Sequence, residues 1–246
     1  MLIAFFADVH ANHLALQACL ARAASLGAEK LVFLGDLVGY GAEPVAVIET
    51  VRALAIKGAV VIKGNHDAAI NDPSTSMNAV ARASIDWTRA QLAPHHTAYL
   101  ASLPLTCVED DRLYVHADAS APARWIYVTG VKQASNSLMA AATPLSLCGH
   151  VHVPALYRAG ADGRIVAHHP AEGIPVPLAS RHRWLAVIGS VGQPRDGNPA
   201  AAFAIYDTLS CELRFERASY DVEEAARLIR CAGLPEQLAA RLLKGR

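Results

Sequence analysis

Short apolar runs and helical segments follow one another along the chain. Residues 2–7 form a continuous apolar run of the kind found in strands that are covered on both faces. Asn12 then suits the N-cap of a helix and Gly27 suits its end. Between 77 and 92 apolar residues recur at roughly helical spacing. The predicted helices are 13–25, 44–56, 77–92, 95–102, 221–231 and 235–244.

Strand-like segments dominate the second half. Asp110 and Asp111 separate two of them like a hairpin turn, and Ala161-Asp162-Gly163 is a turn signal between two others. The predicted strands are 2–7, 30–34, 59–62, 105–109, 112–116, 145–148, 155–158, 164–168, 184–188, 202–206 and 212–217. Because no repeat or low-complexity linker interrupts the pattern, we expect a single domain over residues 1–246, α/β in its first half and more antiparallel in its second.

Composition and charge narrow the classes of protein. Hydrophobic residues make up 53% of the 246 residues, which argues against disorder. Lys and Arg balance Asp and Glu at 22 each, so no basic field predicts a stable nucleic acid partner. No apolar run is long enough to span a bilayer. The five scattered cysteines indicate free thiols, and we expect a soluble cytoplasmic protein.

Polar clusters come directly after five predicted strands, and ligands bind in α/β sheets beyond the carboxyl ends of the strands. We therefore expect the clusters to meet. The side chains concerned are Asp8, His10, Asp36, Asn65, His66, Asp67, His116, His150 and His152.

The residue types in these clusters suit metal ions. Imidazole binds zinc, iron, nickel and manganese, and carboxylates add affinity for harder cations such as manganese. The two oxygens of Asp36 allow it to bridge two cations, the arrangement that phosphatases and nucleases use. A lone histidine is usually structural or solvent-exposed, and we expect this of the remaining histidines. They are His13, His95, His96, His168, His169 and His182.

The motif set resembles that of the calcineurin-like metallophosphoesterase superfamily, in particular its small bacterial phosphodiesterase-type branch. The resemblance rests on Asp8-Val9-His10, Gly35-Asp36, Gly64-Asn65-His66-Asp67, His116, Gly149-His150-Val151-His152 and the loop at 189–197. It implies a four-layer αββα sandwich in which two stacked mixed β-sheets are flanked by helices.

The resemblance also implies roles for individual residues. A first metal ion would be held by Asp8, His10, Asp36 and His152, and a second by Asp36, Asn65, His116 and His150. His66 would lie beside the substrate, where it would stabilise the phosphoryl charge or protonate the leaving oxygen. Asp67 would orient His66 or cap a helix. Arg195 would contact a phosphate. Asp118 would either add a carboxylate near the site or cap a turn.

The expected function is a metal-dependent phosphoric ester hydrolase with two divalent ions, manganese first and iron, zinc or nickel as alternatives. A metal-bridging hydroxide would attack a small phosphodiester or nucleotide in line. Gly39, Tyr40 and Lys63 stand where protein Ser/Thr phosphatases of the superfamily have an Asp and two Arg, which disfavours phosphoprotein substrates. The alternatives are a dinucleoside polyphosphate (diadenosine tetraphosphate-type) hydrolase and, less favoured, a non-catalytic scaffold on the same fold. The sequence leaves the oligomeric state open.

Overall fold

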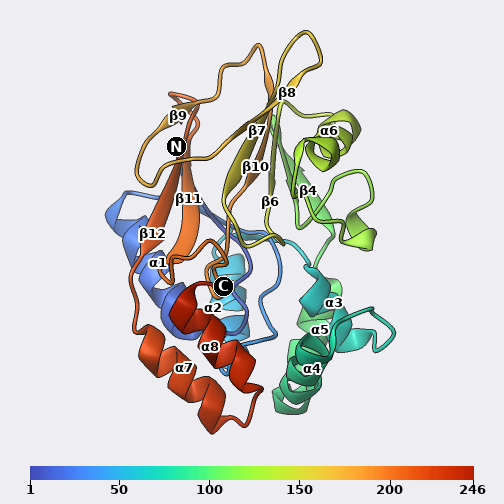
Figure 1. The fold of residues 1–246 in the computed structure, drawn as a ribbon, viewed down its shortest axis with the longest axis vertical. Helices are drawn as coiled ribbons and strands as arrows, with labels where there is room; N and C mark the ends of the chain where they lie inside the picture. The colour runs from blue at the N-terminus through green and yellow to red at the C-terminus, as the bar shows by residue number, and fades with distance from the viewer.

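Two six-stranded mixed sheets form the centre of the computed structural model, which describes residues 1–246 (Figure 1). The first sheet has the order β3 (Val60–Val61), β2 (Lys30–Phe33), β1 (Leu2–Phe6), β11 (Ala201–Asp207), β12 (Glu212–Ala218) and β9 (Val176–Pro177). The second has the order β4 (Thr106–Glu109), β5 (Arg112–Val115), β6 (Leu145–Cys148), β10 (Arg183–Val187), β7 (Ala155–Ala159) and β8 (Ile165–His168). No helix is long and apolar enough to cross a membrane.

Helices cover the outer faces of both sheets and gather at one end of the molecule (Figure 1). α1 (His13–Ser25) and α2 (Pro44–Ile56) pack on the first sheet, and α6 (Val131–Ala140) packs on the second. The other helices are α3 (Asn65–Asn71), α4 (Ala79–Gln91), α5 (Pro94–Ser102), α7 (Val222–Cys231) and α8 (Glu236–Lys244). The architecture is the αββα sandwich that the motifs implied.

Strand β1 shows why the apolar run at the start of the chain is buried on both sides. Its side chains alternate across the sheet. Ile3 and Phe5 point into the core between the two sheets, whereas Ala4 and Phe6 point into the core beneath the helices. Phe6 stacks between Phe33 and Phe203, at ring-centroid distances of 5.2 and 5.7 Å. β1 therefore joins the two cores, and the residues that follow it start from a rigid position.

Parallel pairing brings the carboxyl ends of several strands to the same edge. β1 pairs in parallel with β2, and β2 with β3. In the second sheet β6 lies parallel to both β5 and β10. The hairpins predicted at Asp110 and at Asp162 are confirmed as the turns between β4 and β5 and between β7 and β8. The later part of the chain is more antiparallel, as expected.

The elements that differ from the sequence-based expectation include two helices and one short strand. Helix α6 was not predicted, because it is rich in Ser, Asn and Gln, and Ala134 and Leu138 supply most of its buried face. Helix α3 is absent from the predicted helices, because its 7 residues are too few to show a helical spacing of apolar positions. Residues 170–177, which belong to none of the predicted strands or helices, end in the short edge strand β9.

We expect Phe6→Ala to lower the free energy of unfolding by about 3–5 kcal/mol, since it removes a fully buried ring between two others. Denaturant unfolding followed by circular dichroism measures this. Leu209→Ala is the control, because Leu209 is 86% exposed and its loss should change stability by less than about 0.5 kcal/mol. Equal effects of the two substitutions would contradict the role given to Phe6.

Candidate metal centre

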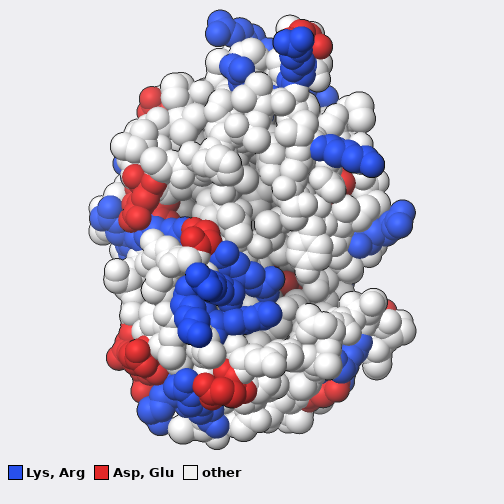
Figure 2. Space-filling view, in the orientation of Figure 1, with Lys and Arg blue, Asp and Glu red and all other residues white.

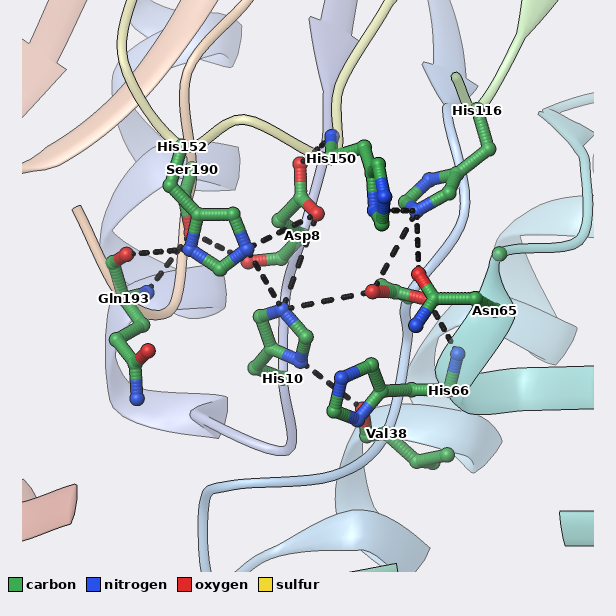
Figure 3. Close-up of polar contacts among 12 residues, drawn as sticks. Asp8, His10, Val38, Asn65, His66, His116, His150, His152, Ser190 and Gln193 are labelled. Carbon is green, nitrogen blue, oxygen red and sulfur yellow. Dashed lines mark hydrogen bonds and ion pairs between the residues drawn. The ribbon is translucent and has the colours of Figure 1, made fainter. Parts of the chain in front are cut away.

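The polar residues after the strand ends converge on one buried point (Figure 3). Asp8 and His10 follow β1, Asp36 follows β2, and Asn65 begins α3 after β3. His116 follows β5, and His150 and His152 follow β6. The carboxylates and imidazoles among them are only 0–4% exposed. Burying such polar groups in an apolar interior is unfavourable unless they are paired. A buried group of this composition needs a compensating charge.

Asp8, His10 and His152 form the first of two ligand groups. The Nε2 atoms of His10 and His152 lie 3.1 Å apart. Asp8 Oδ1 lies 3.3 Å from His152 Nε2 and 3.8 Å from His10 Nε2. Three donor atoms therefore face one another across a space that a single cation can fill.

Asp36, His116 and His150 form the second group, with Asn65 beside it. His116 Nε2 lies 3.2 Å from His150 Nδ1 and 3.1 Å from Asn65 Oδ1. Asp36 Oδ2 is 3.4 Å from His116 Nε2, and it is also 3.6 Å from His10 Nε2 in the first group. Asp36 is thus positioned between the two groups.

Each of the four histidines is held by a backbone carbonyl oxygen on its outer nitrogen. The acceptors are Val38 O for His10, Leu34 O for His116, Trp125 O for His150 and Gln193 O for His152, at 2.6–3.1 Å. A carbonyl oxygen can only accept, so the outer nitrogen carries the hydrogen and the inner nitrogen of a neutral ring keeps its lone pair. Fixing the tautomer in this way is typical of metal-binding histidines.

The two carboxylates are arranged in the same manner. Asp8 Oδ2 accepts the backbone N–H of His150 at 2.8 Å, and Asp36 Oδ1 accepts that of His66 at 2.8 Å. Their other oxygens are buried and have no hydrogen-bond partner. Orphaned carboxylate oxygens opposite inward-facing imidazole lone pairs are suited to divalent cations, so the residues present fit a metal centre.

Backbone strain accompanies the site. Asp8, His10, Asp36, His150 and His152 all have positive φ angles, between 48° and 68°. Few residues other than glycine adopt this conformation, which costs about 1–3 kcal/mol for each. The strained loops are tied together, since the N–H of His10 donates to Asp36 O at 2.9 Å. Such strain concentrates at functional sites.

Two glycines leave room for the carboxylates. A Cβ atom on Gly64 would overlap the Asp36 side chain and backbone, and one on Gly149 would overlap the Asp8 carboxylate. Neither glycine has a positive φ, so close approach is the reason for a glycine at these positions.

Electrostatics favour an ionised Asp36 carboxylate beside a neutral His150 and a protonated His116. Burial alone would raise the pKa of Asp36, but His116 and His66 hold it well below its usual value. Burial lowers the pKa of His150 to about 3, and His116 adds to this effect. Burial also opposes a charge on His116, yet Asp36 raises its pKa to about 9, so a cation would displace a proton there.

His66 lies beside the ligand groups at the start of α3. Its ring centroid is 4.8 Å from that of His10 and 4.5 Å from that of Tyr40. Nδ1 of His66 is buried and has no hydrogen-bond partner. Burial lowers the pKa of His66 to about 4, so the ring is neutral near pH 7 and can donate a hydrogen bond but carries no charge.

The hydrogen bonds of the Asp67 carboxylate go to backbone N–H groups and not to the His66 ring. One of its oxygens accepts the N–H groups of Leu37 and Val38, and the other accepts that of Gly64, at 2.9–3.3 Å. Burial and the Asp36 charge raise its pKa to about 7. The carboxyl group therefore ties the loop after β2 to the start of α3.

Arg195 and Asp118 lie in different loops, after β10 and after β5. The Arg195 guanidinium is 5.7 Å from the Tyr40 ring, and its nitrogens donate to Gln193 Oε1 at 2.9 and 3.3 Å. Asp118 Oδ1 accepts the N–H of Ser120 at 2.6 Å. Of the two roles considered for Asp118, its contacts are those of a turn cap.

Sequence reasoning missed Tyr127 and the acceptors of the histidine N–H groups. Tyr127 stacks on His150 with ring centroids 3.9 Å apart. Trp125, which supplies a carbonyl oxygen, is itself in the left-handed region at φ 53°. Among the acceptors only Gln193 could have been suspected from the sequence, because it lies in the loop at 189–197. The others offer a backbone carbonyl, which any residue type can supply.

Glu49, His95 and His96 form a separate group on the protein surface. His96 Nδ1 accepts the N–H of Ala93, so its Nε2 carries the hydrogen and donates to Glu49 at 3.0 Å. A nitrogen that carries a hydrogen cannot bind a metal ion, and His96 is structural in this arrangement.

Comparisons with known proteins identify the family of the chain. The family description "Calcineurin-like phosphoesterase superfamily domain" matches residues 1–210, and the chain belongs to this superfamily. The crystal structure of a metallophosphoesterase from Sphaerobacter thermophilus is 37% identical, with a TM-score of 0.89 over 100% of this chain and 99% of that chain.

Two further relatives cover the whole chain. The uncharacterized protein MJ0912 of Methanocaldococcus jannaschii is 32% identical over 253 residues, which are 100% of this chain and 98% of its own length. The hypothetical protein PH1004 from Pyrococcus horikoshii OT3 is 20% identical, with a TM-score of 0.79 over 100% of this chain and 98% of that chain, and shares the fold. Superfamily membership makes the protein a metal-dependent hydrolase of phosphoesters.

We expect Gly64→Ala to remove metal binding at the second group, because the added methyl would displace the Asp36 carboxylate. Metal content per chain, measured by inductively coupled plasma mass spectrometry after loading and desalting, should fall below that of the wild type. Gly130→Ala is the matched control, since a Cβ there meets only Gln133 Oε1 at 3.7 Å. Full metal content in Gly64→Ala protein would refute the close-packing argument.

Proposed function

We propose that the protein hydrolyses small phosphodiesters or nucleotides at a centre of two divalent metal ions. The observation that carries this proposal is the pair of ligand groups with inward lone pairs and Asp36 between them. The first ion would be held by Asp8, His10, Asp36 and His152. The second would be held by Asp36, Asn65, His116 and His150. Manganese is the first choice, with iron, zinc or nickel as alternatives.

The bound ions would supply Lewis acidity toward the phosphoryl oxygens and lower the pKa of water. The protein's own part is to keep the ligands in one arrangement. The backbone carbonyls fix the four imidazoles, and the N–H groups of His66 and His150 fix the two carboxylates. This preorganisation avoids rearrangement during the reaction.

His66 is the proposed catalytic residue that binds no metal. Its buried position beside His10, with Nδ1 unpartnered, suits a hydrogen bond to a phosphoryl or leaving-group oxygen. Because burial keeps the ring neutral, donation of a hydrogen bond fits better than transfer from a resident imidazolium. Asp67 would act indirectly, by holding the loop after β2 against α3.

The residues around the centre support a small substrate and not a phosphoprotein. Tyr40 packs against His10 and His66 where a phosphate-binding arginine would otherwise be expected. The Lys63 ammonium is exposed and donates to Ala101 O at 2.8 Å. Arg195 is then the proposed contact for a phosphate, since its guanidinium lies over Tyr40. The free cysteines agree with the expected cytoplasmic location.

Metal removal gives the general test. Purified protein loaded with Mn²⁺ should hydrolyse bis(p-nitrophenyl) phosphate, lose this activity after EDTA treatment and regain it with Mn²⁺, Fe²⁺, Zn²⁺ or Ni²⁺. Release of p-nitrophenolate is followed by absorbance. If the protein stays inactive with each of these metals bound in stoichiometric amount, the proposal fails.

The role of His66 has its own test. We expect His66→Ala to retain its metal content and to lower kcat by about 10²-fold or more, because a hydrogen-bond donor to the reacting group is lost. His13→Ala is a suitable control, since His13 at the start of α1 bonds to Thr50 of α2 and belongs to neither ligand group. Unchanged kcat in metal-replete His66→Ala protein would remove the role.

A further inference from the structure

A cluster of cations surrounds the C-terminal end of α8. Figure 2 shows Lys and Arg side chains gathered where Figure 1 places the C-terminus, with few acidic atoms among them. Arg241 and Lys244 lie in the last turn of α8, and Arg246 follows it. Arg195 lies in the loop after β10, two residues before Gly197, whose N–H donates to Gly245 O at the end of α8. These four residues are called the cationic cluster below.

The cationic cluster is joined to the metal centre by direct contacts. Arg195 N–H donates to the carbonyl of His152, and its guanidinium lies over the Tyr40 ring. That ring is 4.5 Å from His10 and from His66. On the other side the N–H of Gly197 donates to Gly245 O at 2.8 Å. The loop that carries Arg195 therefore holds the end of α8 beside the proposed catalytic groups.

The charges of the cationic cluster are not neutralised within the chain. No carboxylate lies within 4.0 Å of a charged nitrogen of any of the four, although other basic residues nearby are paired. Arg227 pairs with Glu224, and Arg230 pairs with Glu236. The nearest acidic residue in sequence to Arg195 is Asp196, which is held by Arg217. No carboxylate of the chain therefore pairs with the cluster, and the Arg195 guanidinium donates to the neutral amide oxygen of Gln193.

Helix stabilisation accounts for only part of this pattern. Cations in the last turn of a helix interact favourably with its dipole, which covers Arg241 and Lys244. It does not cover Arg195, which belongs to another segment. The Arg195 guanidinium lies 5.7 Å from the Tyr40 ring, and Leu242, next to Arg241 in the sequence, packs in the buried cluster that contains Tyr40. Guanidinium groups on two segments that meet beside Tyr40 suit an anion.

The α7–α8 hairpin is fixed in place by apolar packing. Tyr40 belongs to the same buried cluster as Ile229 and Leu242. A narrow crevice between the hairpin and the metal loops is lined by these residues and by His10 and Gln193. The hairpin lies beyond residue 210, where the match to the superfamily domain ends. It is therefore a feature of this chain that the superfamily match does not account for.

We propose that the cationic cluster binds a second phosphate of the substrate, so that the preferred substrate is a small ester that carries a further phosphate group next to the scissile one. The inference rests on the proposed function, because it takes the scissile phosphate to lie at the metal centre. It favours bisphosphorylated or polyphosphorylated nucleotides over simple diesters. The carrying observation is four unpaired cations on two tied segments beside Tyr40.

A pair of chromogenic esters tests the inference. Thymidine 5′-(p-nitrophenyl phosphate) and its 3′-phosphorylated form share the scissile bond, so in both water adds to phosphorus, the P–O bond breaks and p-nitrophenolate leaves. For the Mn²⁺-loaded wild type we expect kcat/KM to be about tenfold or more higher for the 3′-phosphorylated ester, mainly through a lower KM. In Arg241→Gln/Arg246→Gln protein the ratio of the two kcat/KM values should fall toward one.

Arg164→Gln/Arg181→Gln is the matched control. It removes the same charge at two exposed positions away from the cluster, since Arg164 lies in the turn before β8 and Arg181 lies before β10. This variant should keep the wild-type ratio of the two kcat/KM values. A wild-type ratio near one, or a ratio that survives in Arg241→Gln/Arg246→Gln protein, overturns the inference. A higher kcat/KM for long single-stranded DNA than for the unphosphorylated ester, with no such increase for the 3′-phosphorylated ester, also overturns the inference. That result would favour a nucleic acid surface. Failure to hydrolyse either ester contradicts the proposed function itself.

Discussion

The structure depends on how the charge of Asp36 is accommodated in the interior. A carboxylate with almost no exposure is costly unless every lone pair has a partner. One oxygen is satisfied by the N–H of His66, and the other faces imidazole nitrogens from two different sheets. Because His10 follows β1 and His116 follows β5, this one side chain connects the two halves of the sandwich at its polar edge.

The sandwich makes that arrangement possible because the strands that precede the ligands end at the same edge. β1 is covered on both faces, so Asp8 and His10 emerge from a strand that cannot shift without disturbing two cores. The left-handed conformations that follow turn both side chains inward within three residues. Packing of the apolar interior thereby offsets the strain that the ligand geometry requires.

The order of strands and helices and the set of residues that meet could be predicted because both follow from local patterns, whereas the four-layer sandwich was implied by the resemblance of the motifs. Apolar runs identify strands, and a polar cluster after each parallel strand has to lie at the same edge. The partners of His150 and His152 could not be predicted, since they are backbone carbonyls of Trp125 and Gln193 and any residue type offers one. The contacts of Asp67 could not be predicted either. A carboxylate after Gly64-Asn65-His66 can cap a helix or orient a ring, and only the position of the loop after β2 distinguishes these roles.

The division of the chain between ligand loops and the C-terminal hairpin has a consequence for how such proteins diversify. The hairpin touches the metal loops through apolar side chains and through one backbone hydrogen bond, from Gly197 to Gly245. No metal ligand comes from it. Relatives can therefore exchange the residues of α8, or the length of the hairpin, while the ligand set is inherited unchanged. Selectivity and reactivity are then free to evolve at separate rates within one scaffold.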